Sequence, residues 1–176
     1  MIKELAQDSI LEFQKTVGLL FRKDLVFALI CGSLARGEGN KHSDADMLIA
    51  VNKVNDRLLE RFREWYLTFH LKLGLVPDST YLGEVVLIDS LDQALAAAKK
   101  HIPVRVIDKE QIYDGIVWAG MLVGETIGFV GDMKAYNKYR NEAEIICQKW
   151  RQSLLTSESP SLRQEVALKN IITYQP

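Results

Sequence analysis

The residue types best suited to phosphate and metal chemistry are concentrated in residues 31–46, with the sequence CGSLARGEGNKHSDAD. Asp44 and Asp46 are spaced i, i+2, so on an extended chain their side chains would project from one face, about 7 Å apart. Two carboxylates this close repel each other unless a cation lies between them, and such oxygen ligands suit Mg²⁺. Gly32 lacks a Cβ and lets the backbone approach a ligand, while Ser33 and the following amides, at the start of a short helix, could hold phosphates.

Two common phosphate-binding motifs do not fit this segment. A P-loop requires Lys followed by Ser or Thr after its second glycine, whereas Gly37 is followed by Glu38 and Gly39. The dinucleotide-binding fingerprint fails as well, because Gly37-Glu-Gly39 is followed by Asn, Lys and His42. What remains is a glycine–serine turn that follows one strand, and an Asp-x-Asp pair that leads into the next.

Two short apolar runs must position these residues. Residues 25–31 run directly into Gly32, and residues 47–51 follow Asp46. Continuous apolar runs of this length are typical of buried strands. The chain between them is too short for a full helical crossover, so we expect a mixed sheet.

The rest of the chain alternates between helical and strand patterns. An apolar stripe at helical spacing predicts a helix over residues 2–22, and a second helical face begins at the cap Asn55 and ends at Gly74. His70 lies on this second helix beside Phe69, which favours a packed or surface histidine over a ligand. Strands that alternate with helices indicate an α/β (α+β) fold.

The later part of the chain contains one segment whose secondary structure stays open. The segment 116–130 is apolar with three interior glycines, so helix, strand and hairpin all stay open there. The other expected features are a strand over 81–88, a helix over 91–100 opened by a capping box at Ser90 and Gln93, a strand over 103–107, a turn at 114–115, a long helix from the cap Asp132 to about residue 155, a linker over 156–161 and a short terminal helix after Pro160.

Composition narrows the functional classes. The chain has 176 residues, 48% of them hydrophobic, and a formal net charge of −1, which argues against a strongly basic nucleic-acid binder or a polybasic membrane protein. The two cysteines, Cys31 and Cys147, have no CxxC spacing, so neither a disulfide framework nor a zinc site is expected. The first residues lack the pattern of a signal peptide and no apolar run could span a bilayer, so we expect a cytoplasmic location.

The segment from Gly32 to Asp46 resembles the signature of the polymerase-β-type nucleotidyltransferase superfamily. Its form, Gly-Ser-x-x-Arg-Gly-x-x-x-x-x-Ser-Asp-x-Asp, is most similar to the small minimal nucleotidyltransferases and the antibiotic nucleotidyltransferases. The resemblance covers roughly residues 20–110. It implies a nucleotidyltransferase-type mixed β-sheet flanked by helices, with residues 1–131 as the catalytic domain and 132–176 as a C-terminal helical extension packed on it.

The resemblance also implies a third carboxylate on a later strand, and two residues are candidates. Glu84 interrupts an otherwise apolar strand, where a carboxylate needs a partner or a metal to offset its desolvation. Asp89 lies at the end of that strand, where its place before Ser90 also explains it. We favour Glu84, although the family more commonly has Asp at this position, and its role stays open between metal ligand and general base.

The resemblance implies the following site. Asp44, Asp46 and Glu84 would be the catalytic and metal-binding carboxylates, holding two Mg²⁺ ions. The co-substrate would be a nucleoside triphosphate (NTP), such as ATP, and the nucleotide-binding residues would be Gly32, Ser33, Arg36 and Ser43. Arg36 has two alternatives, a clamp on the triphosphate or a brace for the loop carboxylates, and its bidentate fork favours the contact with phosphate. Ser43 is expected to orient the Asp-x-Asp turn.

The acceptor is the least constrained part of the prediction. A small molecule or a protein is favoured as acceptor, because a template-dependent or tRNA-directed polymerase normally needs extra basic domains, and this chain has neither the length nor the charge for them. Aminoglycoside-like antibiotics are one class of small molecule, and the acidic residues that could favour such cationic substrates are Glu38, Asp78, Glu84 and Asp89. The alternative is a minimal-nucleotidyltransferase antitoxin-type module that binds or nucleotidylates a helical partner protein. Nucleic acid and membrane partners are not expected, and an oligomer is compatible with the sequence.

Overall fold

The computed structural model describes residues 5–40, 42–77, 85–100, 105–108 and 111–155, and only the backbone at 105–108, 111–114 and 153–155. The chain forms two compact units, Met1–Ile88 with Glu125–Ala135 and Asp89–Gly124 with Tyr136–Pro176. In chain order the elements are α1 (Gln7–Phe21), η1 (Arg22–Asp24), β1 (Leu25–Ile30), α2 (Gly32–Ala35), β2 (Met47–Val51), α3 (Asp56–Leu73), β3 (Val85–Leu87), α4 (Ile88–Lys99), β4 (Arg105–Asp108), β5 (Gln111–Asp114), α5 (Gly115–Val123), β6 (Ile127–Gly131) and α6 (Met133–Leu155).

A four-stranded sheet in the order β3-β2-β1-β6 organises the first unit. β1 pairs antiparallel with both β2 and β6, whereas β2 and β3 are parallel. The sheet is therefore mixed, as the short connection between the first two strands predicts. Because β1 and β2 are antiparallel, the residues after Ile30 and the residues before Met47 lie side by side, where β1 ends and β2 begins.

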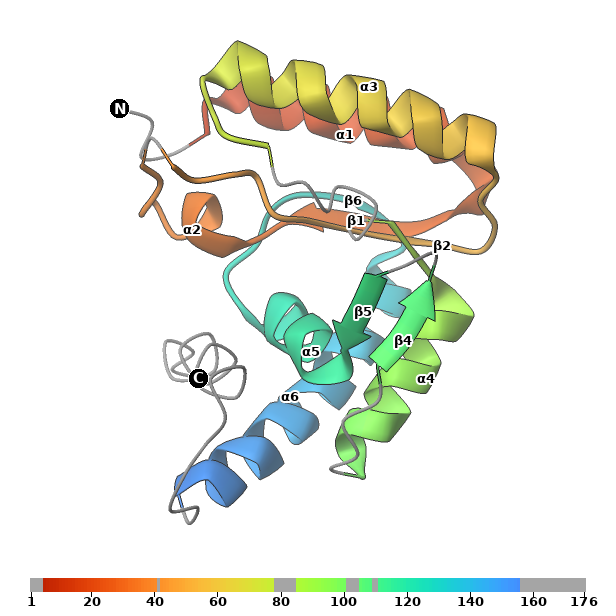
Figure 1. Cartoon of the computed structure of the whole chain (residues 1–176), viewed down its shortest axis with the longest axis vertical. Helices are drawn as coiled ribbons and strands as arrows, with labels where there is room; N and C mark the ends of the chain where they lie inside the picture. The colour runs from red at the N-terminus through yellow and green to blue at the C-terminus, as the bar shows by residue number, and fades with distance from the viewer. Residues whose placement is uncertain (1–4, 41, 78–84, 101–104, 109–110, 156–176) are drawn as a thin grey trace. The chain divides into compact units, whose positions relative to one another are not determined.

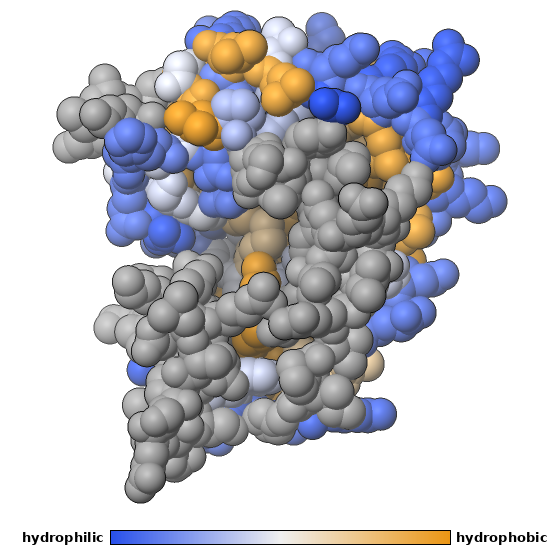
Figure 2. All heavy atoms as spheres, in the orientation of Figure 1, coloured by the Kyte–Doolittle hydropathy of each residue, from blue (hydrophilic) through white to orange (hydrophobic). Residues whose placement is uncertain are grey.

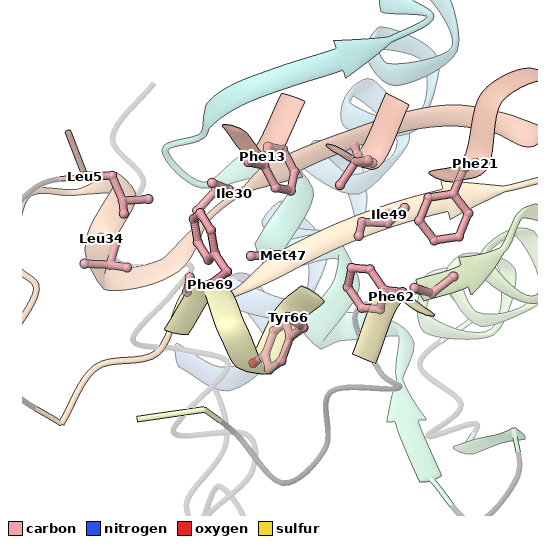
Figure 3. Close-up of a cluster of buried hydrophobic side chains, with 14 of the residues drawn as sticks. Leu5, Phe13, Phe21, Ile30, Leu34, Met47, Ile49, Phe62, Tyr66 and Phe69 are labelled. Atoms are coloured by element: carbon pink, nitrogen blue, oxygen red, sulfur yellow. The ribbon is translucent and has the colours of Figure 1, made fainter. Parts of the chain in front are cut away.

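Two helices, α1 and α3, lie side by side along this sheet (Figure 1). Each helix presents an aromatic face to β1 and β2, and Figure 3 shows Phe13 and Phe21 of α1 opposite Phe62 and Phe69 of α3. All four rings are buried. Burial of a large apolar side chain contributes about 1.5–3 kcal/mol, so this aromatic layer is a main reason that the sheet keeps its position against the helices.

The ends of α3 are determined by its own sequence. Asn55 accepts a hydrogen bond from the Leu58 amide at its N-terminus, at 2.9 Å, as expected for a cap. Gly74 ends the helix in the left-handed region at φ 66°, where glycine carries no Cβ penalty. Both predicted ends are confirmed. The position of the C-terminal end matters, because the last turn of α3 lies against the Asp-x-Asp segment.

The second unit contains α4, α5, most of α6 and a two-stranded antiparallel sheet of β4 and β5. Hydrogen bonds tie its helices together: Trp150 Nε1 donates to the Ala98 carbonyl at 2.8 Å, and the Tyr136 hydroxyl donates to the Leu122 carbonyl at 3.2 Å. α5 also packs closely on α4, because a Cβ at Gly115 would lie 2.0 Å from the Ala94 carbonyl oxygen.

Most predicted elements are confirmed, and three local interpretations change. The turn predicted at 114–115 is wrong, because β5 ends at Asp114 and α5 begins at Gly115. The capping box at Ser90 is wrong, because α4 already begins at Ile88 and Ser90 lies within its first turn. The ambiguous segment 116–130 divides into α5 and β6. Asp132 caps α6 as predicted, accepting from the Lys134 and Ala135 amides.

Several expectations fall on residues outside the described ranges. These are the start of the strand over 81–88, the linker over 156–161 and the helix after Pro160. The strand β5 was not predicted, and the division of the chain at residue 131 stays a prediction.

Among the coloured atoms of Figure 2, hydrophilic residues predominate, with smaller apolar groups between them. Among the described residues of the first unit, the large exposed apolar side chains are Leu11, Leu19, Leu71, Val76 and Met133. Among the described residues, no helix combines the length and the apolar character required to cross a bilayer.

Candidate active site

The glycine–serine turn follows β1 directly and faces the segment that leads into β2. Cys31, the residue after β1, donates its backbone N–H to the carbonyl of Asp46 at 2.9 Å. This bond continues the β1–β2 pairing by one step, to the residues on which the motif depends. The chain then turns into α2, the short helix predicted to begin beside Ser33.

Gly32 lies in contact with the carboxylate of Asp46. A Cβ added to Gly32 would lie 1.8 Å from Oδ2 of Asp46 and 2.7 Å from its Cγ. Gly32 also adopts φ 74°, a left-handed conformation that L side chains rarely adopt. Glycine is therefore required here for two reasons, its backbone angle and the neighbouring carboxylate, and the two halves of the motif lie in direct contact.

The Asp-x-Asp segment is extended and enters β2 without a break. Burial alternates along it: Ser43, Ala45 and Met47 are buried, whereas Asp44 and Asp46 are half-buried. This period of two is that of a strand, in which alternate side chains point to opposite faces. The two carboxylates therefore share a face, as their spacing predicts, although both precede the first residue of β2.

Ser43 organises the turn that precedes the carboxylates. Its Oγ accepts a hydrogen bond from the Asn40 amide at 2.9 Å and lies 3.2 Å from the Oγ of Ser33. The Ser43 amide in turn donates to the Asn40 carbonyl at 3.0 Å. The expected role of Ser43 in orienting this turn is confirmed, and Ser33 is joined to the same network.

His70 is the site residue whose contact the sequence does not reveal. The imidazole is fully buried, its Nδ1 lies 2.8 Å from the Tyr66 carbonyl, and its Nε2 accepts the Ala45 N–H at 2.9 Å. Burial lowers the pKa of His70 below its ordinary value, although the Tyr66 carbonyl and the charge of Asp44 act in the opposite direction. The interpretation of His70 as a packed residue is confirmed. The sequence indicates that His70 lies on the buried face of α3, but it does not indicate the hydrogen bond from Ala45.

Arg36 braces a loop carboxylate, the second of its two predicted alternatives. Its Nε donates to Oε2 of Glu38 at 2.8 Å, with Glu38 60% exposed. An exposed pair of this kind contributes little to stability. Since an Arg side chain has five N–H donors, this contact leaves others available for a phosphate.

The structure describes only one of the two candidates for the third carboxylate. Asp89 is exposed in the first turn of α4, and Glu84 lies outside the described residues. Asp78, expected among the acidic residues near a cationic acceptor, also lies outside them. Within the described part of the chain, no three His, Cys, Asp or Glu side chains come together as a metal-binding group.

Comparison with known proteins agrees with this geometry. A family model described as a nucleotidyltransferase domain matches residues 14–108, more than half of the chain. The match runs from α1 to β4 and includes the glycine–serine turn and the Asp-x-Asp segment. No curated protein and no solved structure matches the chain. The resemblance inferred from the motif is thus confirmed, and the chain belongs to the nucleotidyltransferase domain family.

Proposed function

We propose that the protein transfers a nucleoside monophosphate from an NTP to a hydroxyl group of a small molecule, with Mg²⁺ as the required metal and pyrophosphate as the second product. Membership of the nucleotidyltransferase family supports nucleotidyl transfer in general and an NTP as substrate. The metal and the class of acceptor are argued from the residues around Gly32 and Asp46.

The contact between Gly32 and Asp46 is the observation that carries the proposal. A triphosphate bound at the glycine–serine turn would lie beside a carboxylate, and two negative groups at that distance repel strongly. A divalent cation between them removes this repulsion. The absent Cβ at Gly32 matches this requirement, because any larger residue would overlap the Asp46 carboxylate.

The donor set fits Mg²⁺. Asp44 and Asp46 offer oxygen ligands from one face of an extended segment, and Mg²⁺ typically takes one or two carboxylates together with substrate phosphates. With Glu84 as the third carboxylate, these residues would hold two ions. Bound Mg²⁺ would activate the acceptor hydroxyl and neutralise charge on the departing pyrophosphate.

The remaining residues would bind and orient the triphosphate. Gly32 and Ser33 offer backbone N–H groups and a hydroxyl at the start of α2, and Arg36 offers a guanidinium four residues after Gly32. In the reaction, the acceptor oxygen forms a bond to the α-phosphorus, and the bond from this phosphorus to the bridging oxygen breaks. Pyrophosphate leaves with the electron pair, and the acceptor proton passes to a carboxylate base, for which Glu84 is the candidate.

Strand register favours Glu84 over Asp89 as the third carboxylate. β3 runs parallel to β2, and its first residue, Val85, lies beside Ile49, the middle residue of β2 and three residues after Asp46. Glu84 immediately precedes Val85 in the sequence, whereas Asp89 follows Leu87, which pairs with Val51 at the far end of β2.

Glu84→Gln is expected to lower the rate of pyrophosphate release by about 100-fold, because either a metal ligand or a general base is lost. Asp89→Asn is the matched control and is expected to change the rate less than about 2-fold. The assay would contain Mg²⁺, the preferred NTP and a set of hydroxyl compounds. A large effect of Asp89→Asn together with a small effect of Glu84→Gln would exchange the two assignments.

A small-molecule acceptor is favoured over nucleic acid by charge. Protein–nucleic acid affinity depends largely on Lys and Arg contacts with phosphates, and this chain has a formal net charge of −1. Aminoglycoside-like compounds carry several hydroxyls and positive charges, and they are the first acceptors to test.

Calorimetric titration of ATP, GTP, CTP and UTP tests the nucleotide site directly. We expect one or more of these to bind, and the affinity to fall at least about 10-fold when Mg²⁺ is replaced by EDTA, because the phosphates then face Asp44 and Asp46 without a cation. A folded protein that binds no nucleotide under either condition would contradict the proposal.

A further inference from the structure

Two hydrogen bonds between residues distant in sequence join the Asp-x-Asp segment to the end of α3 and the residues that follow it. The Ala45 amide donates to Nε2 of His70 at 2.9 Å, and the Val76 amide donates to the Ser43 carbonyl at 3.2 Å. The Ala45 N–H is thus held by the last turn of α3, and the Ser43 carbonyl by the segment that follows this helix. Ala45 is the residue between the two carboxylates.

The imidazole of His70 can serve this purpose in only one tautomer. A carbonyl oxygen accepts hydrogen bonds, so the nitrogen beside the Tyr66 carbonyl, Nδ1, must carry the proton. Nε2 then has a free lone pair and accepts the Ala45 N–H. Both ring nitrogens are therefore used, and the ring is neutral, in agreement with the lowering of its pKa by burial.

The surroundings hold the ring in this orientation. His70 is fully buried, and its ring centroid lies 4.0 Å from that of Tyr66, one helical turn earlier. Without the imidazole nitrogen, the buried Ala45 N–H would lose its hydrogen-bond acceptor, at a cost of about 1–3 kcal/mol. The peptide between Asp44 and Ala45 is therefore fixed by a side chain that belongs to the hydrophobic core.

We propose that His70 is a positioning residue of the metal site: through the Ala45 N–H it fixes the backbone from which Asp44 and Asp46 project. The inference rests on the proposed function, because it concerns the two carboxylates that would bind Mg²⁺. His70 itself touches neither substrate nor metal. Partners that orient metal ligands in this way typically change metal affinity 10–100-fold when they are removed.

Two substitutions at the same position separate positioning from packing. His70→Gln keeps an acceptor oxygen at the distance of Nε2, whereas His70→Asn keeps only a donor near the Tyr66 carbonyl. We expect His70→Asn to weaken Mn²⁺ binding, titrated by electron paramagnetic resonance with the preferred NTP, by about 10-fold or more. His70→Gln is expected to restore the affinity to within about 3-fold of wild type. Thermal unfolding of both variants provides the control for packing.

The outcomes distinguish this inference from the proposed function. Equal losses in folded His70→Gln and His70→Asn, or wild-type Mn²⁺ affinity in His70→Asn, would overturn the inference and leave the proposed function intact. Absence of Mn²⁺–nucleotide binding by the wild type would overturn both. If neither variant folds, a scalar coupling across the hydrogen bond between the Ala45 amide nitrogen and Nε2 of His70, measured in the wild type, decides: its absence overturns the inference.

Discussion

Asp46→Asn is expected to weaken Mg²⁺-dependent nucleotide binding by about 100-fold, or about 2.7 kcal/mol, and Asp44→Asn is expected to have an effect of the same order. The physical reason is the loss of a full negative charge beside the metal, with no change in side-chain shape. Because Asn has the size of Asp, the contact with Gly32 is preserved and the fold should be unaffected. Calorimetric titration of the preferred NTP with and without Mg²⁺ measures the effect.

Asp8→Asn is the matched control for the loss of charge. Asp8 is an exposed residue in the first turn of α1 and lies outside residues 31–46, so its replacement removes the same charge without changing the motif. We expect a change in stability below about 1 kcal/mol from the lost interaction with the helix dipole, and no change in nucleotide affinity. Wild-type affinity in folded Asp46→Asn and Asp44→Asn variants would exclude these carboxylates as the metal ligands.

Gly32→Ala is expected to lower Mg²⁺-dependent nucleotide affinity by about 100-fold, because the new methyl group would overlap the Asp46 carboxylate and displace it. The substitution also places an L side chain at φ 74°, at a cost of about 1–2 kcal/mol in the free energy of unfolding. Titration of the NTP and thermal unfolding measure the two effects separately.

Gly74→Ala separates backbone strain from the contact with Asp46. Gly74 has a similar φ of 66°, but a Cβ there would meet no atom within 4 Å. We expect a comparable loss of stability from the left-handed conformation and an unchanged nucleotide affinity. If Gly32→Ala and Gly74→Ala lose stability equally and both bind nucleotide as wild type does, the contact between Gly32 and Asp46 has no functional role.

The elements next to the motif could be predicted because their signals are local. The strands β1 and β2 are short continuous apolar runs, and α3 carries its own cap at Asn55 and its own terminator at Gly74. Each of these signals acts through the backbone within a few residues. Local signals mislead where they compete: the capping-box pattern at Ser90 predicts a helix start, but it lies inside the first turn of α4.

The segment 116–130 shows where local signals are insufficient. Its apolar residues and glycines are compatible with helix or strand, and the choice depends on distant partners. β6 becomes a strand because it pairs with β1, about 100 residues earlier, with Phe27 beside Gly131. Pairing of this kind depends on which edge of the sheet is open, and the open edge is a property of the assembled fold.

The sequence by itself determined the chemistry: the residue types, their spacing from Gly32 to Asp46, and through them the nucleotidyltransferase family. Only the tertiary structure decided the contacts that make these residues a site. The contact of Gly32 with Asp46 joins residues 14 positions apart, and the hydrogen bond from Ala45 to His70 joins residues 25 positions apart. Residue types and spacing indicate which chemistry a side chain can perform, but its contact partner is selected by packing. The hydrophobic effect that drives packing has no direction, so it does not specify this partner. A buried N–H must then form its hydrogen bond with whichever acceptor the core provides.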